Sequence, residues 1–118
     1  MIVDDDPHNR LLLTTLLHHA GHDVTEAATG IAGHLTAQAL QPDLIVVDLS
    51  LPDISGVELI RRLRADERTS GVRIALYTAT HAPDALDELA ETFGVVGVIP
   101  KPADPQRILD AFSRLLQP

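Results

Sequence analysis

Short apolar runs alternate along the chain with longer stretches in which apolar residues recur every three or four positions. The short runs have the length and composition of β-strands. They lie at Met1–Val3, Asp23–Ala28, Asp43–Leu49, Val72–Ala79 and Val95–Pro100. The run at 43–49 is apolar on both faces, a pattern typical of a central parallel strand covered by helices, whereas the run at 23–28 alternates like a strand at a sheet edge.

The longer stretches have the periodicity of amphipathic helices. They cover Leu11–Ala20, Ile31–Leu40, a segment that begins after Ser55, Asp84–Phe93 and a segment that begins at Pro105. Two of the helix starts carry capping signals. Ser55 and Glu58 have the spacing of a capping box, and Asp104 followed by Pro105 has the pattern of an N-cap with proline in the first turn.

The third of these helices separates apolar from basic residues most clearly. Its apolar side chains are expected to face the core and its cations to face water, with Leu59, Ile60 and Leu63 on the first face and Arg61, Arg62 and Arg64 on the second.

The alternation of five strands with five helices predicts a doubly wound parallel sheet with helices on both faces, formed as one domain over residues 1–118. In such a sheet, ligands bind beyond the carboxyl ends of the strands. The functional side chains are therefore expected directly after the apolar runs.

Composition narrows the classes of function. The chain has no cysteine, so disulfides and thiolate metal sites are excluded, and only 3% of its residues are aromatic. A formal net charge of −8 argues against direct binding of DNA or RNA, because phosphate neutralisation needs clustered Lys and Arg. No apolar run approaches the ~20 residues of a membrane-spanning helix. We therefore expect a cytoplasmic domain that does not contact a membrane.

Polar residues lie at the ends of four of the five predicted strands. Asp4 and Asp5 follow the first strand, and Asp48, Thr78 and Lys101 lie at the ends of the third, fourth and fifth. Three carboxylates with no His or Cys nearby suit a hard cation such as Mg²⁺, with Mn²⁺ as a second candidate. Such a site leaves an aspartate able to attack phosphorus, while the ammonium and the hydroxyl hold the phosphoryl oxygens.

Asp6 belongs to the same run of acids but has a different expected role. Because Pro7 follows it, Asp6 has the pattern of a helix N-cap with proline at the first helical position. Three histidines lie around the end of the same helix, where an imidazolium interacts favourably with the helix dipole, and we expect no metal role for them: His18, His19 and His22.

Four motifs together give the chain a family resemblance. They are "IVDDD", "PDLIVVDLSLPDISGVEL", "YTAT" and "KPAD", in this order along the sequence. With these motifs the chain resembles the response-regulator receiver domains of two-component signalling, from Met1 to about Leu116. The resemblance implies a flavodoxin-like strand order of 2-1-3-4-5.

The resemblance also assigns roles to the acidic residues. Asp48 matches the aspartate that is phosphorylated. Asp4 and Asp5 match the acidic pair that binds Mg²⁺ together with Asp48 and the backbone carbonyl of Ser50.

Residues of the last two strands match the groups that hold the phosphoryl group in the family. Thr78 matches the switch hydroxyl, assisted by the backbone N–H of Ala79, and Lys101 matches the lysine that pairs with the phosphate. The peptide bond between Lys101 and Pro102 matches one that is cis in the family.

The implied function is a phosphorylation-dependent switch, not an enzyme that turns over small substrates. A histidine kinase or a histidine phosphotransfer domain would supply the phosphoryl group, and the domain would assist its own phosphorylation and dephosphorylation. The changed surface around the fourth helix, fifth strand and fifth helix would then bind a partner or form a homodimer.

Two alternatives remain open at this stage. The first is a degenerate receiver that acts only as an interaction or dimerisation module. The complete set of acids with Thr78 and Lys101 argues against it, but the aromatic switch residue of the family falls on Val98, which keeps it open. A phosphohydrolase with the same aspartyl-phosphate chemistry is the other alternative, but Ser50 stands where such enzymes often have a second acid. The motifs resemble receivers embedded in hybrid histidine kinases more than stand-alone regulators.

Overall fold

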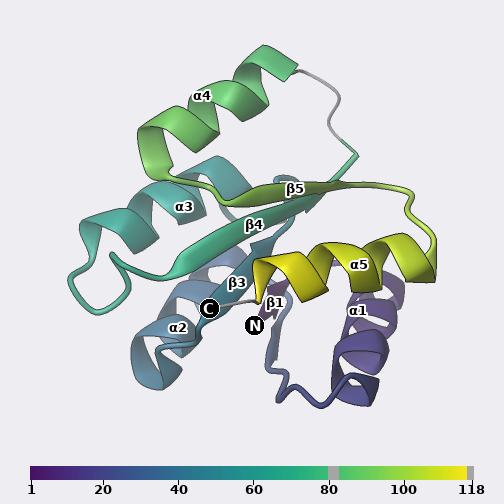
Figure 1. The fold of residues 1–118 in the computed structure, drawn as a ribbon. Coiled ribbons are helices and arrows are strands. Elements are labelled where there is room, and N and C mark those ends of the chain that lie inside the picture. The colour runs from purple at the N-terminus through teal and green to yellow at the C-terminus, as the bar shows by residue number, and fades with distance from the viewer. Residues whose placement is uncertain (80–82, 117–118) are drawn as a thin grey trace.

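The chain folds around a five-stranded parallel sheet. The computed structural model describes residues 1–79 and 83–116, and its strands lie in the order β2-β1-β3-β4-β5 (Figure 1). Going along the chain, the strands are β1 (Ile2–Val3), β2 (Glu26–Ala27), β3 (Leu44–Val47), β4 (Arg73–Thr78) and β5 (Gly97–Pro100). The predicted fold class and strand order are confirmed.

Five helices alternate with the strands and cover both faces of the sheet (Figure 1). Their bounds are α1 (Pro7–His19), α2 (Gly30–Leu40), α3 (Gly56–Ala65), α4 (Pro83–Phe93) and α5 (Pro105–Leu115). None of the helices in the described part of the chain has both the length and the apolar character that crossing a lipid bilayer requires.

The sheet separates two apolar cores, because successive side chains of a strand point to opposite faces. One core joins the sheet to α1 and α5, and Phe112 is its largest fully buried side chain. The other core joins the sheet to α3 and α4 and includes Leu59, Ile60 and Leu63, as predicted from the pattern of α3. Strand β4 serves both, since Leu76 lies in one core and Tyr77 in the other.

The helix starts agree closely with the capping signals in the sequence. The side chain of Asp6 accepts a hydrogen bond from the backbone N–H of His8, and Pro7 is the first residue of α1. Asp104 caps α5 by accepting from the N–H of Arg107 at 2.9 Å. The strand predicted at 23–28 is shorter in the structure, where β2 covers only Glu26 and Ala27. It lies at the edge of the sheet, and its pairing with β1 extends over these two residues.

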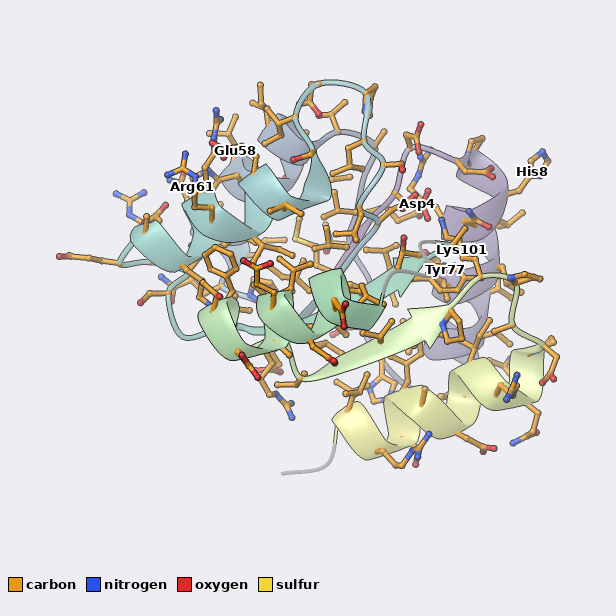
Figure 2. All side chains as sticks on the ribbon, turned by 90° about the horizontal axis from the view of Figure 1, so that it is seen from above. Asp4, His8, Glu58, Arg61, Tyr77 and Lys101 are labelled. Atoms are coloured by element: carbon orange, nitrogen blue, oxygen red, sulfur yellow. The ribbon has the colours of Figure 1, made fainter. Side chains whose placement is uncertain are left out.

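The capping box of α3 is only half formed. The hydroxyl oxygen of Ser55 accepts from the backbone N–H of Glu58 at 3.1 Å. The Glu58 carboxylate is engaged further along the helix instead, where it binds Arg61 (Figure 2). It also binds Arg62. These two arginines hold the pKa of Glu58 at about 2, well below its ordinary value.

Arg64 corrects one expectation. The pattern of α3 places it on the water-facing side, but its guanidinium donates to three backbone carbonyls, those of Phe93 at 2.7 Å, Ser70 at 3.0 Å and Val72. Phe93 ends α4 and Val72 precedes β4, so these carbonyls lie at the ends of elements, where helix or strand partners are lacking. The five donors of a guanidinium are well suited to such a cluster.

Gly56 lets α3 approach the end of β3. Its backbone N–H donates to the carbonyl of Leu49 at 2.8 Å. A Cβ at this position would lie 2.5 Å from the carbonyl oxygen of Asp48 and 2.5 Å from the Cα of Leu49. Both atoms belong to the backbone and cannot turn aside, so the first turn of α3 fits against this loop only without a side chain.

We expect Gly56→Ala to lower the free energy of unfolding by about 1–3 kcal/mol, the usual cost of overpacking. Urea denaturation followed by circular dichroism would measure the change. Gly71→Ala is the matched control, because a Cβ at Gly71 would meet nothing within 4 Å. Equal stability of the two variants would contradict the steric explanation.

Asp53 ties the loop after β3 to α2. Its two carboxylate oxygens accept from the backbone N–H groups of Gly30 and Ile31, at 2.9 Å each. The Ile31 N–H contributes most to lowering the pKa of Asp53, which falls to about 2. A carboxylate at this end of a helix is also favoured by the helix dipole.

Because the pKa of Asp53 is lower in the folded than in the unfolded chain, its stabilisation is present above about pH 4 and disappears as the pH falls towards 2. We expect Asp53→Ala to be less stable than the wild type at neutral pH, with a gap that narrows in acid. Urea denaturation at about pH 6 and about pH 3 would test this. A gap of constant size would show that the carboxylate charge is not responsible.

Candidate functional site

The carboxyl ends of the parallel strands bring the predicted polar residues to one edge of the sheet. Asp4 follows β1, Asp48 follows β3, Thr78 ends β4 and Lys101 follows β5. Figure 2 shows Asp4 and Lys101 close together near α1. The residues of four strand ends, almost a hundred positions apart in the sequence, therefore form one cluster.

Three carboxylates lie within reach of a single cation. One oxygen from each of Asp4, Asp5 and Asp48 can be chosen so that all three lie within 4.8 Å of one another. Asp4 and Asp48 are buried, with exposed fractions of 1% and 7%, whereas Asp5 is exposed to solvent. The cluster thus has a buried side and an open side.

Backbone groups fix the two buried carboxylates. One oxygen of Asp4 accepts from the backbone N–H of Asp6 at 2.9 Å. One oxygen of Asp48 accepts from the N–H of Ser50 at 3.2 Å. In each case the second oxygen is left to face the interior of the site.

Lys101 lies between these two inward oxygens. Its ammonium nitrogen is 3.0 Å from an oxygen of Asp4 and 3.0 Å from an oxygen of Asp48. The backbone N–H of Lys101 donates to the carbonyl of Thr78 at 2.9 Å, which holds the start of the following loop to β4. The peptide bond between Lys101 and Pro102 is cis.

The charges of the site are unequal. Burial raises the pKa of Asp4, while the Asp6 N–H and the Lys101 ammonium act in the opposite direction. Burial alone would lower the pKa of Lys101, but its bonds to Asp48 and Asp4 outweigh this effect, and the pKa is raised. Lys101 therefore remains protonated, and one ammonium faces three carboxylates.

This donor set fits a magnesium ion. Mg²⁺ prefers hard oxygen ligands, binds through a small number of carboxylates and keeps several of its waters. The buried pair and the exposed Asp5 provide such ligands, and the open side of the cluster leaves room for water. Mn²⁺ has the same ligand preference.

The remaining predicted residues lie around the cluster. Thr78 is buried at the end of β4, with an exposed fraction of 2%, and Ala79 beside it is exposed. Ser50 is exposed next to Asp48. Thr80, the last residue of the "YTAT" motif, lies outside the described residues.

The structure separates the aspartate run into two parts. Asp4 and Asp5 contribute to the carboxylate cluster, whereas the Asp6 side chain accepts from the N–H of His8 at 2.9 Å as the cap of α1. Asp6 still supports the cluster through its backbone, since its N–H donates to the Asp4 carboxylate.

Two supporting contacts could not be read from the sequence. Arg10 donates from its guanidinium to the backbone carbonyl of Asp4 at 2.6 Å, and so holds the strand end from the side of α1. The ring of Tyr77 lies 4.9 Å from the Lys101 ammonium, measured to the ring centroid. The second contact depends on the pairing of β4 with β5, for which the sequence carries no signal.

Comparisons with known proteins agree on a family. The family described as response regulator receiver domain matches residues 1–113. The DNA-binding dual master transcriptional regulator RpaA of Synechocystis is 37% identical over 119 residues, covering 99% of this chain and 48% of the relative. The chain thus spans about half the length of that relative.

A shorter relative and a solved structure match from end to end. Sporulation initiation phosphotransferase F of Bacillus subtilis is 28% identical, with 98% of this chain and 91% of the relative covered. The chemotaxis response regulator CheY4 of Vibrio cholerae superposes with a TM-score of 0.89 at 28% identity, covering 98% of this chain and 95% of that structure. The chain belongs to the response-regulator receiver domain family of two-component signalling.

Proposed function

We propose that this domain is a phosphorylation switch whose phosphoacceptor is Asp48. The observation that carries the proposal is the position of the Asp48 carboxylate, which is buried, paired with the Lys101 ammonium and close to two further acids. A carboxylate placed solely to stabilise the fold would gain nothing from two acidic neighbours, since like charges repel.

In the proposed reaction a phosphohistidine of a kinase or phosphotransfer domain is the donor. An oxygen of Asp48 attacks phosphorus, a P–O bond forms, the P–N bond breaks, and the imidazole of the donor leaves and takes up a proton. Asp4, Asp5, Asp48 and the backbone carbonyl of Ser50 would hold a Mg²⁺ ion, which would neutralise charge on the phosphoryl oxygens.

The chain's own residues position the product. Lys101, already 3.0 Å from Asp48, pairs with a phosphoryl oxygen once the carboxylate has become an acyl phosphate. The hydroxyl of Thr78 and the backbone N–H of Ala79 donate to the other oxygens. Both lie at the end of β4, beside the backbone bond that links Thr78 to Lys101.

The response would reach partners through the surface formed by α4, β5 and α5. Two apolar residues are exposed there, Val96 at 47% just before β5 and Val98 at 40% within it. This surface could bind a second copy of the domain or another protein. Val98 lacks the ring that would move between buried and exposed positions, so we propose that a shift of backbone position transmits the signal.

One observation favours a second candidate, an interaction module that is never phosphorylated. It is the same Val98, because loss of a switch residue is expected in a receiver that no longer switches. The complete set of acids with Lys101 and Thr78 outweighs this single position.

The acidic chain, with a formal net charge of −8, gives no support to direct nucleic-acid binding. We propose a cytoplasmic location for the domain.

The direct test is phosphorylation by a small donor. Incubation with acetyl phosphate and Mg²⁺ should add a single group of about 80 Da to the wild type, seen by intact-mass spectrometry, and none to Asp48→Asn. Asp110→Asn, which removes an exposed carboxylate from α5, is the matched control and should be phosphorylated normally.

Two other results would contradict the switch. Absence of an adduct under all conditions would favour the interaction module. Rapid multiple turnover of varied phosphoesters would favour an enzyme of the phosphohydrolase class.

Magnesium affinity tests how the aspartate run is divided. Asp5→Asn removes an exposed carboxylate of the cluster and should weaken Mg²⁺ binding about tenfold or more. Asp6→Asn keeps a competent helix cap and should leave the affinity nearly unchanged. Isothermal titration of the two variants and the wild type measures this, and a large loss in Asp6→Asn would show that Asp6 belongs to the metal site.

A further inference from the structure

Tyr77 places an aromatic ring against the lysine of the site. The ring centroid lies 4.9 Å from the Lys101 ammonium nitrogen, within the range of a cation–π interaction. The side chain is buried, with an exposed fraction of 3%, and Lys101 is 15% exposed. Figure 2 shows the two residues close together beside Asp4.

The pairing of β4 with β5 fixes this arrangement. Tyr77 lies opposite Ile99, and Thr78 lies opposite Pro100. Tyr77 and Ile99 both belong to the core shared with α1 and α5. Lys101 is two residues beyond Ile99, so its side chain emerges on the same side of the sheet as the tyrosine ring.

The lysine needs a partner that does not change during the reaction. Its ammonium is held in this structure by Asp4 and Asp48. Both carboxylates would be engaged differently by a bound cation, and Asp48 would change chemically when phosphorylated. A lysine also has a flexible stem of four carbons, which allows the ammonium to leave the site.

We propose that the ring of Tyr77 is a positioning group that keeps the Lys101 ammonium at the phosphoacceptor while its carboxylate partners change. This inference rests on the proposed function of Asp48. The attraction comes from the face of the ring, so it does not require the hydroxyl and does not depend on the state of either carboxylate. Tyr77 touches no reacting atom and acts through Lys101.

A role in core packing alone makes a different prediction. The ring packs with Ile99 and Phe112 in an apolar core, and a leucine at position 77 would preserve most of that apolar contact. It would not preserve the electrostatic attraction to an ammonium. Tyr77→Phe retains the ring, so the two substitutions separate packing from positioning.

The test compares wild type, Tyr77→Phe and Tyr77→Leu, each with Lys101 intact and with Lys101→Met. The rate of adduct formation from acetyl phosphate is measured at saturating Mg²⁺, and urea denaturation confirms that each variant is folded. We expect Tyr77→Phe to retain the rate and Tyr77→Leu to lose roughly fivefold. In the Lys101→Met background the change at Tyr77 should have no further effect.

A second measurement does not need phosphorylation. The ε-methylene protons of Lys101 should show an upfield ring-current shift in nuclear magnetic resonance spectra of the wild type and Tyr77→Phe. This shift should be absent in Tyr77→Leu. The spectra are recorded with and without Mg²⁺, and the shift should persist when the ion is bound.

The outcomes separate this inference from the proposed function. Equal rates in wild type and Tyr77→Leu would overturn it, as would an equal loss with and without Lys101, or a ring-current shift that vanishes when Mg²⁺ binds. Absence of any adduct on the wild type would instead overturn the proposed function, and the ring contact would then have only a structural role.

Discussion

The interaction on which the site depends is the sharing of one ammonium by two buried carboxylates. Asp4 and Asp48 directly follow two neighbouring strands, β1 and β3, and would repel each other if Lys101 did not lie between them. The third acid, Asp5, is exposed and adds a further negative charge to the cluster. The fold therefore holds together a group of charges that is balanced only in part, and this remaining imbalance is what makes the edge of the sheet attractive to a cation.

Much of the fold could be predicted because its signals are local. Alternation of apolar runs with amphipathic stretches indicates the parallel sheet, and Asp6, Ser55 and Asp104 mark the starts of three helices within a residue. The convergence of Asp4, Asp48 and Lys101 also follows from strand ends alone, since all strands of a parallel sheet end at the same edge. Only the order of the strands required a resemblance to known proteins.

The features that the sequence did not reveal depend on contacts between distant elements. Arg64 has the periodicity of a water-facing residue, yet its guanidinium donates to the carbonyl of Phe93 at the end of α4 and to that of Val72 just before β4. Asp53 looks like an ordinary loop acid, and its role appears only when α2 is seen to begin beside it. The ring of Tyr77 reaches Lys101 through strand register, which cannot be deduced from one sequence. Each case involves a side chain whose partner is supplied by another part of the fold.

The close fit at Gly56 bears on protein engineering. The backbone of the first turn of α3 rests directly on the backbone of Asp48 and Leu49. The backbone path directly after β3, from which the Asp48 side chain projects, is thus constrained by a helix that begins eight residues later. A designer who grafts this acceptor onto another α/β scaffold would have to transfer residues 48–56 as one block, with the glycine included. If the aspartate were transferred alone, the backbone that follows it would keep the conformation of the recipient scaffold.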